Sequence, residues 1–373
     1  MKKLLVTFFA LLFLLSFEQT QAQSPSEFVP PKQEYYKGQV TQIIKEGSRD
    51  IEQYKNFFQF IEVKFLEGPE KGKTVTFENG GSLKMVEQKS LKAGDQIIVL
   101  KVTQNDKVTY SVWDKLRLNY IYFAVIAFFA LILIFAGVRG IGSILGMIIS
   151  FGILIGFIVP QILAGADPLL VSIEGSLVIM FVTIYLAHGV SKRTTSAVIS
   201  TFISLTLVGI LAFIFVKIFH LTGLGDENSY LLQMRAANIN PQGLLLGGII
   251  IGALGVLDDI TTTQSAAVFE LFKLNRKLSI TDLFIKGYTI GREHIASLVN
   301  TLILAYVGVS LGLFVIFVLN PNNTPVWVIL NSEMLSEEIV RSIAGSIGLI
   351  LAVPITTLIA SFIAKRDKDD GRK

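Results

Sequence analysis

Long apolar stretches constrain this chain more than any other feature, because each is close to the length that crosses a membrane. A transmembrane helix needs about 20 mostly apolar residues. Seven such stretches follow residue 117, namely 118–136, 141–159, 169–187, 195–217, 242–257, 295–318 and 339–363. The chain is 51% hydrophobic, a share that excludes an ordinary soluble enzyme. The sequence therefore predicts an α-helical polytopic membrane protein with about seven spans, held in a transmembrane helical domain at residues 114–364.

The N-terminal end has the features of a secretory signal peptide. Two lysines, an apolar run and then small residues precede Ala22. We expect a signal peptide at residues 1–22 that is cleaved, because its apolar run is short for a membrane span. An uncleaved first helix is the alternative. A linker at residues 23–34 follows, and in both cases the next segment lies outside the cytoplasm.

Residues 35–113 differ from the rest of the chain in composition and in the pattern of apolar residues. They hold about five short β-rich runs, interrupted by Gly, Pro, Asn and Asp. Several runs alternate apolar and polar residues, as half-buried strands do. They predict a small extracytoplasmic β-barrel or sandwich at the N-terminus, and an OB-like barrel is one form that fits. We expect a structural or partner-docking module and no nucleic-acid partner, because no basic, aromatic groove stands out.

The distribution of positive charge predicts the orientation of the spans. With the β-rich domain outside, the cytoplasmic segments are 137–140, 188–194, 258–294 and a basic tail at 365–373. These segments contain thirteen Lys and Arg residues, whereas the three outer loops contain only Arg235. Positive residues collect on the cytoplasmic side of membrane proteins. We therefore expect a multi-pass protein of the bacterial plasma membrane, with the N-terminal domain outside and the C-terminus in the cytoplasm.

Several classes of enzyme lack support in the sequence. There are no cysteines and only three histidines, none at metal-ligand spacing, so we expect no metal site and no disulfide. No phosphate-binding loop, HExxH or GxSxG motif occurs. The adjacent aspartates at 258–259 also differ from the separated pair of an intramembrane aspartyl protease. We predict a protein that is not an enzyme and that uses no cofactor.

The stretch GALGVLDDITTT, residues 252–263, is the first candidate site. Its aspartates, Asp258 and Asp259, stand at the predicted cytoplasmic end of the fifth and most glycine-rich span. One of them could cap a new helix over residues 258–272. A cap does not explain two carboxylates followed by threonines, however. The alternative is an ion or substrate site that also uses Thr261 and Thr262.

Four further polar residues are candidates for the same role. Glu174 lies within the third span, where a charge costs several kcal/mol unless it is paired, protonated or hydrated. Asn300 lies within the sixth span, where helix packing is the alternative explanation. Arg292 precedes that span and is either a cytoplasmic anchor or a partner for Asp258, Asp259 or Glu270.

Two blocks of the sequence resemble the YibE/F-like bacterial membrane proteins. One is GLLLGGIIIGALGVLDDITTTQSAAVFEL at residues 243–271, and the other is IGREHIASLVNTLILAYVGVSL at residues 290–311. The order of parts is also similar, with a signal segment, a small extracytoplasmic β-rich region and seven or eight spans. As we align the blocks, Asp259 belongs to the shared pattern and Asp258 is an addition. The resemblance implies this architecture, and it transfers no catalytic residue.

These observations favour a transporter or permease of a small solute or ion. The alternative is a non-transporting membrane sensor or assembly partner that acts through its β domain. The lipid bilayer and an unidentified small solute or ion are the expected partners, and a homo-oligomer or a membrane partner stays open.

Overall fold

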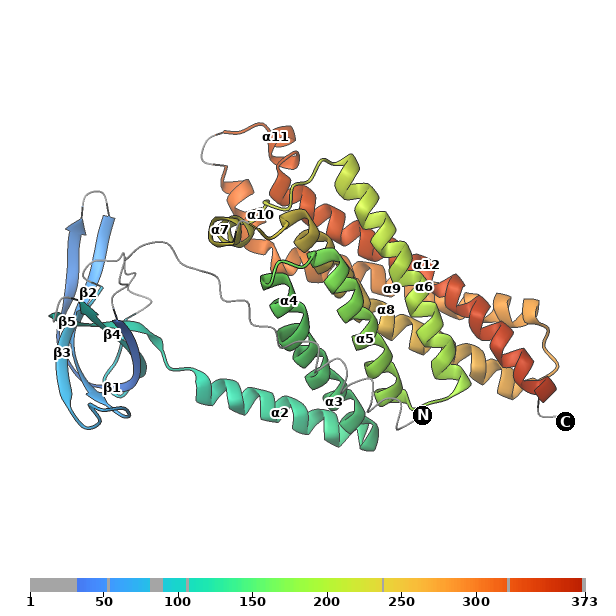
Figure 1. Ribbon diagram of the computed structural model, residues 1–373, viewed down its shortest axis with the longest axis horizontal. Helices are drawn as coiled ribbons and strands as arrows, with labels where there is room; N and C mark the ends of the chain where they lie inside the picture. The colour runs from blue at the N-terminus through green and yellow to red at the C-terminus, as the bar shows by residue number, and fades with distance from the viewer. Residues whose placement is uncertain are drawn as a thin grey trace. The chain divides into compact units, whose positions relative to one another are not determined.

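The computed structural model of the protein describes residues 32–51, 54–80, 90–104, 107–236, 238–320 and 323–370 (Figure 1). The predicted signal peptide, residues 1–22, lies outside the described residues. The chain divides into two compact units near residue 131. One contains a β-sheet and the other a bundle of helices.

The first unit is built on a five-stranded antiparallel sheet that curls into a half-barrel (Figure 1). Its strand order is β3-β2-β1-β4-β5. The long first strand pairs with β2 on one side and with β4 on the other. The strands are β1 (Lys32–Ile51), β2 (Tyr54–Phe65), β3 (Thr74–Asn79), β4 (Gln96–Gln104) and β5 (Lys107–Lys115). The expected β-rich domain is therefore confirmed, in the form of one curled sheet.

The concave face of the sheet holds its own apolar core. Side chains that alternate along the strands meet there, because successive residues of a strand point to opposite faces. Val40, Ile61, Val63, Ile97 and Val99 are all fully buried in this core. Burial of this kind, which removes apolar area from water, is the main force that holds the sheet in its curled form.

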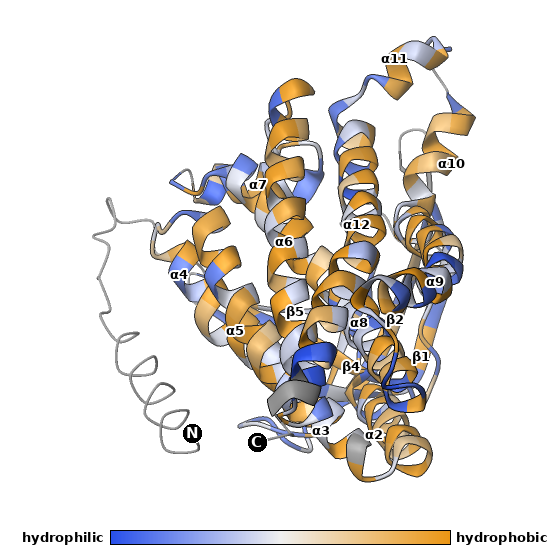
Figure 2. Ribbon diagram, turned by 90° about the vertical axis from the view of Figure 1, so that its right-hand side faces the viewer, coloured by the Kyte–Doolittle hydropathy of each residue, from blue (hydrophilic) through white to orange (hydrophobic). Residues whose placement is uncertain are grey.

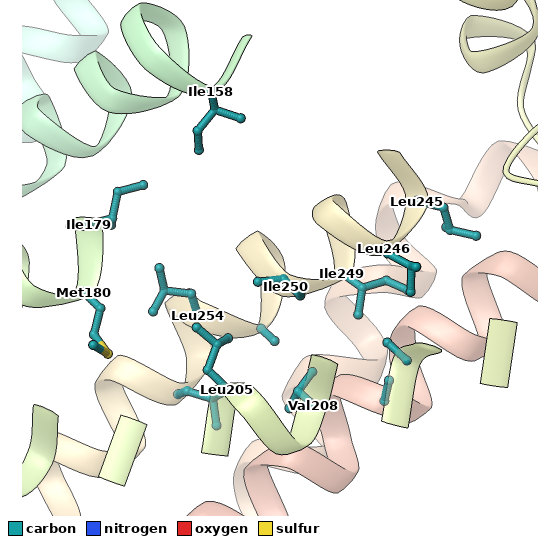
Figure 3. Close-up of a cluster of buried hydrophobic side chains, with 14 of the residues drawn as sticks. Ile158, Ile179, Met180, Leu205, Val208, Leu245, Leu246, Ile249, Ile250 and Leu254 are labelled. Carbon is teal, nitrogen blue, oxygen red and sulfur yellow. The ribbon is translucent and has the colours of Figure 1, made fainter. Parts of the chain in front are cut away.

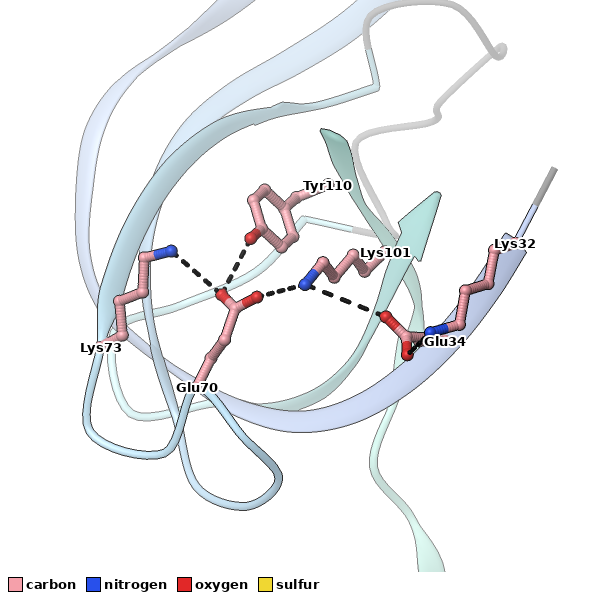
Figure 4. A network of polar contacts seen from close by, with 6 residues as sticks. All are labelled: Lys32, Glu34, Glu70, Lys73, Lys101 and Tyr110. Atoms are coloured by element: carbon pink, nitrogen blue, oxygen red, sulfur yellow. Dashed lines mark hydrogen bonds and ion pairs between the residues drawn. The ribbon is translucent and has the colours of Figure 1, made fainter. Parts of the chain in front are cut away.

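An ion network joins the loop between β2 and β3 to the other side of the sheet (Figure 4). Glu70 in this loop accepts hydrogen bonds from Lys101 of β4, from Tyr110 of β5 at 2.8 Å and from Lys73 at 3.2 Å. Lys101 also lies 3.9 Å from Glu34 of β1. The hydrogen bond from Lys101 is the main cause that lowers the pKa of Glu70 to about 2. The network thus fixes the loop across the sheet.

The second unit consists of helices, several of which are long enough to cross a membrane. Among the described residues six helices pass this test, or seven if α9 and α10, which meet at a 65° bend, form one broken span. The helices are α2 (Leu118–Ala136), α3 (Val138–Ile153), the π-helix η2 (Leu154–Ile158), α4 (Val159–Leu163), α5 (Pro168–His188), α6 (Lys192–Ile218), α7 (Glu227–Arg235), α8 (Pro241–Leu274), α9 (Ile280–Val309), α10 (Leu311–Leu319), α11 (Val326–Leu330) and α12 (Glu333–Asp370). α2 crosses the boundary between the two units. The predicted membrane protein with about seven spans is confirmed.

The centre of the bundle is formed by α6, α8 and α12, which pack against one another. Leu205 and Val208 of α6 meet Ile249, Ile250 and Leu254 of α8 in the buried core (Figure 3). The outward faces of the helices are also largely apolar (Figure 2). Apolar residues on both the inside and the outside are what a bundle in lipid requires, since lipid replaces water as its solvent.

α8 differs from the prediction at the aspartates. The helix of the predicted fifth span does not end at residue 257, and neither Asp258 nor Asp259 caps a helix. α8 is one helix of 34 residues that starts after Asn240, whose side chain accepts a hydrogen bond from Gly243 N at 3.2 Å. Within the helix, Thr262 Oγ1 donates to the Asp258 carbonyl at 2.8 Å, so its hydroxyl has a partner there. Packing against α6 and α12 outweighs the low helix propensity of the threonines.

Candidate functional site

A pocket of about 560 Å³ lies between four helices of the bundle, and we call it the four-helix pocket. Ser143 and Met147 come from α3, Thr183 from α5 and Arg193 from α6. α8 contributes the largest share of the polar groups, which are Asp258, Asp259, Thr262 and Thr263. The pocket therefore brings both aspartates of the GALGVLDDITTT stretch together with residues from three other helices.

The two aspartates differ in how far they are exposed. Asp258 is half-buried, and its Oδ2 accepts a long hydrogen bond of 3.4 Å from Thr183 Oγ1. Asp259 is exposed at the pocket wall. Within the described part of the chain, no ion pair of 4.0 Å or less neutralises either carboxylate. The wall contributed by α8 thus presents two carboxyl groups to the pocket.

The turn between α5 and α6 places basic groups at the same pocket. α5 ends at Gly189, whose φ of 74° is a backbone conformation that favours glycine. Ser191 then caps α6 and accepts a hydrogen bond from Thr194 N at 3.1 Å. These two local signals position His188 and Arg193 on the pocket lining. The pocket therefore combines carboxylates, hydroxyls, an arginine and a histidine.

The face of α8 that points away from the pocket is polar as well, but its polar side chains are buried against α6. Thr261 Oγ1 lies 2.6 Å from Thr201 Oγ1 of α6, and Ser265 Oγ lies 2.5 Å from Ser196 Oγ. All four side chains are fully buried. Thr261, a predicted site residue, therefore joins α8 to α6 and does not line the pocket.

The remaining predicted site residues lie elsewhere on the bundle. Glu270 is exposed on α8 and pairs with Lys273 at 2.6 Å. Glu174 is exposed on α5, and Arg292 and Asn300 are exposed on α9. None of these four lines the four-helix pocket. The alternative role of Arg292, as a partner for an aspartate or for Glu270, is not seen among the described residues.

Several pocket residues could not be identified from the sequence. Thr183, His188 and Arg193 belong to spans or turns that are some 65 to 75 positions away from the aspartates. The cluster HGVSKRTT at 188–195 contained only the basic charge expected of a cytoplasmic turn. Its contribution to the site follows from the packing of α5 and α6 beside α8.

Two glycines in α9, Gly287 and Gly291, lie at close contacts with neighbouring helices. A Cβ atom at Gly287 would lie 2.9 Å from Val268 Cγ2 of α8. A Cβ atom at Gly291 would lie 2.3 Å from Val353 Cγ1 of α12 and 2.9 Å from Gln264 Oε1 of α8. Spaced four residues apart, these glycines let α9 approach both helices closely.

Comparison with known proteins gives the same division of the chain. The model of the YibE/F-like protein family matches residues 124–366, which include the four-helix pocket. The model of the YibE/F family N-terminal domain matches residues 33–115, which include the curled sheet. No curated protein and no solved structure matches the chain. Because the two matches together cover most of its length, the chain belongs to the YibE/F-like family.

Proposed function

We propose that the protein is a permease that moves a small solute or ion across the bacterial plasma membrane through the four-helix pocket. The observation that carries this proposal is the pair Asp258 and Asp259, which face a pocket of about 560 Å³ without an ion-pair partner among the described residues. Ionisable groups within membrane spans are costly and commonly mark the path of a substrate or ion. Structural packing does not require two such charges beside an open space.

The groups that line the pocket indicate a solute with positive charge. Two carboxylates and the hydroxyls of Thr183, Thr262 and Thr263 are oxygen ligands that suit a cation or a protonated amine. Arg193 could hold an anionic group at the other end of a zwitterion. No group of three or more His, Cys, Asp or Glu side chains in the described residues could hold a metal ion. We propose binding and movement of the solute, with no catalytic step and no cofactor.

The charge distribution supports an orientation for this permease. Thirteen basic residues in the predicted cytoplasmic segments, against Arg235 in the outer loops, favour a C-terminus in the cytoplasm and a β domain outside. The α5–α6 turn, with Lys192 and Arg193, belongs to the cytoplasmic set. The four-helix pocket adjoins this turn, so we propose that it opens toward the cytoplasm.

Flux into proteoliposomes tests the proposal. Purified protein is screened with sodium, rubidium, protons and labelled amino acids, and the species that moves is then measured in variants. Asp258→Asn and Asp259→Asn should each lower its flux at least about tenfold, since each removes a charge from the pocket wall. Glu270→Gln is the matched control, because it removes an exposed α8 carboxylate that lies outside the pocket. Full flux in both aspartate variants would exclude the pocket as the transport site.

A second function is supported by the independence of the sheet. The half-barrel has a fully buried core of its own and a separate family match, as expected of a module that binds something. A sensor or assembly partner would lose its activity in cells when residues 35–113 are deleted, yet tolerate Asp259→Asn. A permease would show the reverse order of sensitivity in the flux assay.

A further inference from the structure

The outer face of the curled sheet carries an exposed pair of aromatic rings. The rings of Tyr35 in β1 and Trp113 in β5 meet edge to face, with centroids 5.3 Å apart. Tyr35 is 47% exposed and Trp113 is 60% exposed. Their neighbours along the strands, Tyr36 and Val112, pack against the core on the opposite face. The aromatic pair is therefore not needed to fill the core.

Two half-buried residues of β4 extend this apolar area. Leu100 pairs with Tyr35 in the β1–β4 register, so the two side chains share the outer face. Ile98 alternates with the buried Val99 and adjoins the irregularity in the β4–β5 register. We call Tyr35, Ile98, Leu100 and Trp113 the aromatic patch. An apolar area of this kind on the outside of a small domain marks a contact surface.

Only a few residues of backbone separate this patch from the first membrane-length helix. Leu116 N still donates to Gln96 O of β4 at 2.8 Å, and Ile121 N already donates to Arg117 O at 3.0 Å. The last bond of the sheet and the first bond of α2 therefore involve adjacent residues. From Trp113 to Leu118 the chain spans five residues, or at most about 17 Å in extended form.

The length of α2 places its first residue at the edge of the lipid. α2 has 19 residues and contains no Asp, Glu, Lys or Arg. A helix of that length is about 28 Å long, which is close to the roughly 30 Å thickness of the hydrocarbon core. Leu118 therefore lies at the boundary of the hydrocarbon, and the headgroup layer begins there. The aromatic patch is tethered within reach of this layer.

We propose that the aromatic patch lies in the lipid headgroup layer and holds the β domain against the membrane surface. Trp and Tyr are the side chains that prefer this layer, because their rings are apolar and their N–H and O–H groups remain hydrated. The tether from Leu116 to Arg117 supplies the proximity, and the exposed ring pair supplies the affinity. Burial of the patch in lipid also removes it as a site of aggregation in water.

Tryptophan fluorescence of the full-length protein in vesicles tests the proposal. The chain has two tryptophans, so Trp327→Phe leaves Trp113 as the single reporter. The protein is reconstituted in phosphatidylcholine brominated either near the headgroup or deep in the acyl chains. We expect about twofold loss of Trp113 emission with the shallow bromines, less with the deep ones, and weak quenching by aqueous iodide.

A second single-tryptophan protein controls for the position on the outer face of the sheet. Lys64 is an exposed residue of β2, a strand that is separated from β5 by β1 and β4. Lys64→Trp, combined with Trp113→Phe and Trp327→Phe, should give emission typical of water and no bromine quenching. Water-exposed emission from Trp113 would overturn the proposal. Equal quenching at both positions would overturn the assignment of the contact to the aromatic patch, and circular dichroism checks that the control is folded.

Discussion

Gly291 of α9 lies so close to Val353 of α12 that a Cβ atom at position 291 would stand 2.3 Å from Val353 Cγ1. Real Cβ atoms do not approach other carbons so closely, so Gly291→Ala must displace the Val353 side chain or push the two helices apart. We expect a loss of about 1–3 kcal/mol in stability, as for other overpacked cores. Thermal unfolding in detergent, followed by loss of the monodisperse peak in size-exclusion chromatography, measures this change.

Gly308→Ala provides the control for that substitution. Gly308 lies on the same helix, and a Cβ atom there would meet nothing within 4 Å. Alanine favours a helix over glycine by up to about 1 kcal/mol, so we expect unchanged or slightly raised stability. Similar melting of the two variants would contradict the close packing of α9.

Gly255→Leu should block the four-helix pocket without disturbing the bundle. Gly255 lines the pocket, and a Cβ atom there has no neighbour within 4 Å, so the new side chain would enter open space. We expect normal folding and at least about tenfold loss of flux in proteoliposomes. Gly248→Leu is the matched control, because Gly248 is two turns away on α8, equally open and outside the pocket. Equal flux in the two variants would show that the pocket is not on the transport path.

The network around Glu70 should make the β domain sensitive to acid. The pKa of Glu70 is lowered from 4.5 to about 2 in the folded protein, chiefly by the hydrogen bond from Lys101. A lowered pKa adds stability above pH 4.5 that is lost as the pH falls toward 2. Thermal melts of the full-length Trp327→Phe protein in nanodiscs, followed through Trp113 fluorescence, should show this loss.

Lys101→Met should flatten that acid dependence. Without its cation, Glu70 loses the main cause of its lowered pKa, and we expect about 1–2 kcal/mol lower stability at neutral pH. Lys71→Met removes an exposed lysine from the same loop and should change neither the stability nor its pH dependence. An unchanged acid profile in the Lys101 variant would mean that other carboxylates control the acid transition.

Glu333 at the start of α12 should control the order of the loop after α6. Its Oε1 accepts hydrogen bonds from Thr222 N, from Thr222 Oγ1 at 2.7 Å and from Gly223 N at 3.2 Å. Glu333→Ala should speed hydrogen exchange of these two amides about tenfold, since charged hydrogen bonds contribute about 1.5–3 kcal/mol. Glu338→Ala, which removes a nearby carboxylate of α12 without bonds to this loop, should leave their exchange unchanged. Equal rates in both variants would refute the role of Glu333.

Prediction from the sequence succeeded where local patterns decide the structure. The limits of α2 at 118 and 136 match the predicted span, because an uninterrupted apolar run leaves one choice of helix. The β-rich runs of the N-terminal domain likewise became strands. Their curl and the Glu70 network could not be predicted, since both depend on which strands meet in space.

The prediction failed where tertiary packing competes with local signals. Two aspartates and three threonines in a row allowed a new helix that one aspartate caps, yet α8 continues through them. Thr261 of α8 forms a hydrogen bond with Thr201 of α6, and packing between these two helices offsets the poor helix propensity of the segment. The residues of α3, α5 and α6 that line the pocket beside Asp258 could not be predicted for the same reason. Spacing along one chain carries no information on which faces of distant helices meet.

The uninterrupted passage from Leu116 to Arg117 connects the sheet to α2 without a spacer. The last hydrogen bond of the sheet and the first hydrogen bond of α2 belong to adjacent residues, so any coupling between the two elements runs through one peptide bond. Inserting two or three glycines between these residues would lengthen the connection while leaving both parts folded, and it would therefore test whether the sheet and the helix act together.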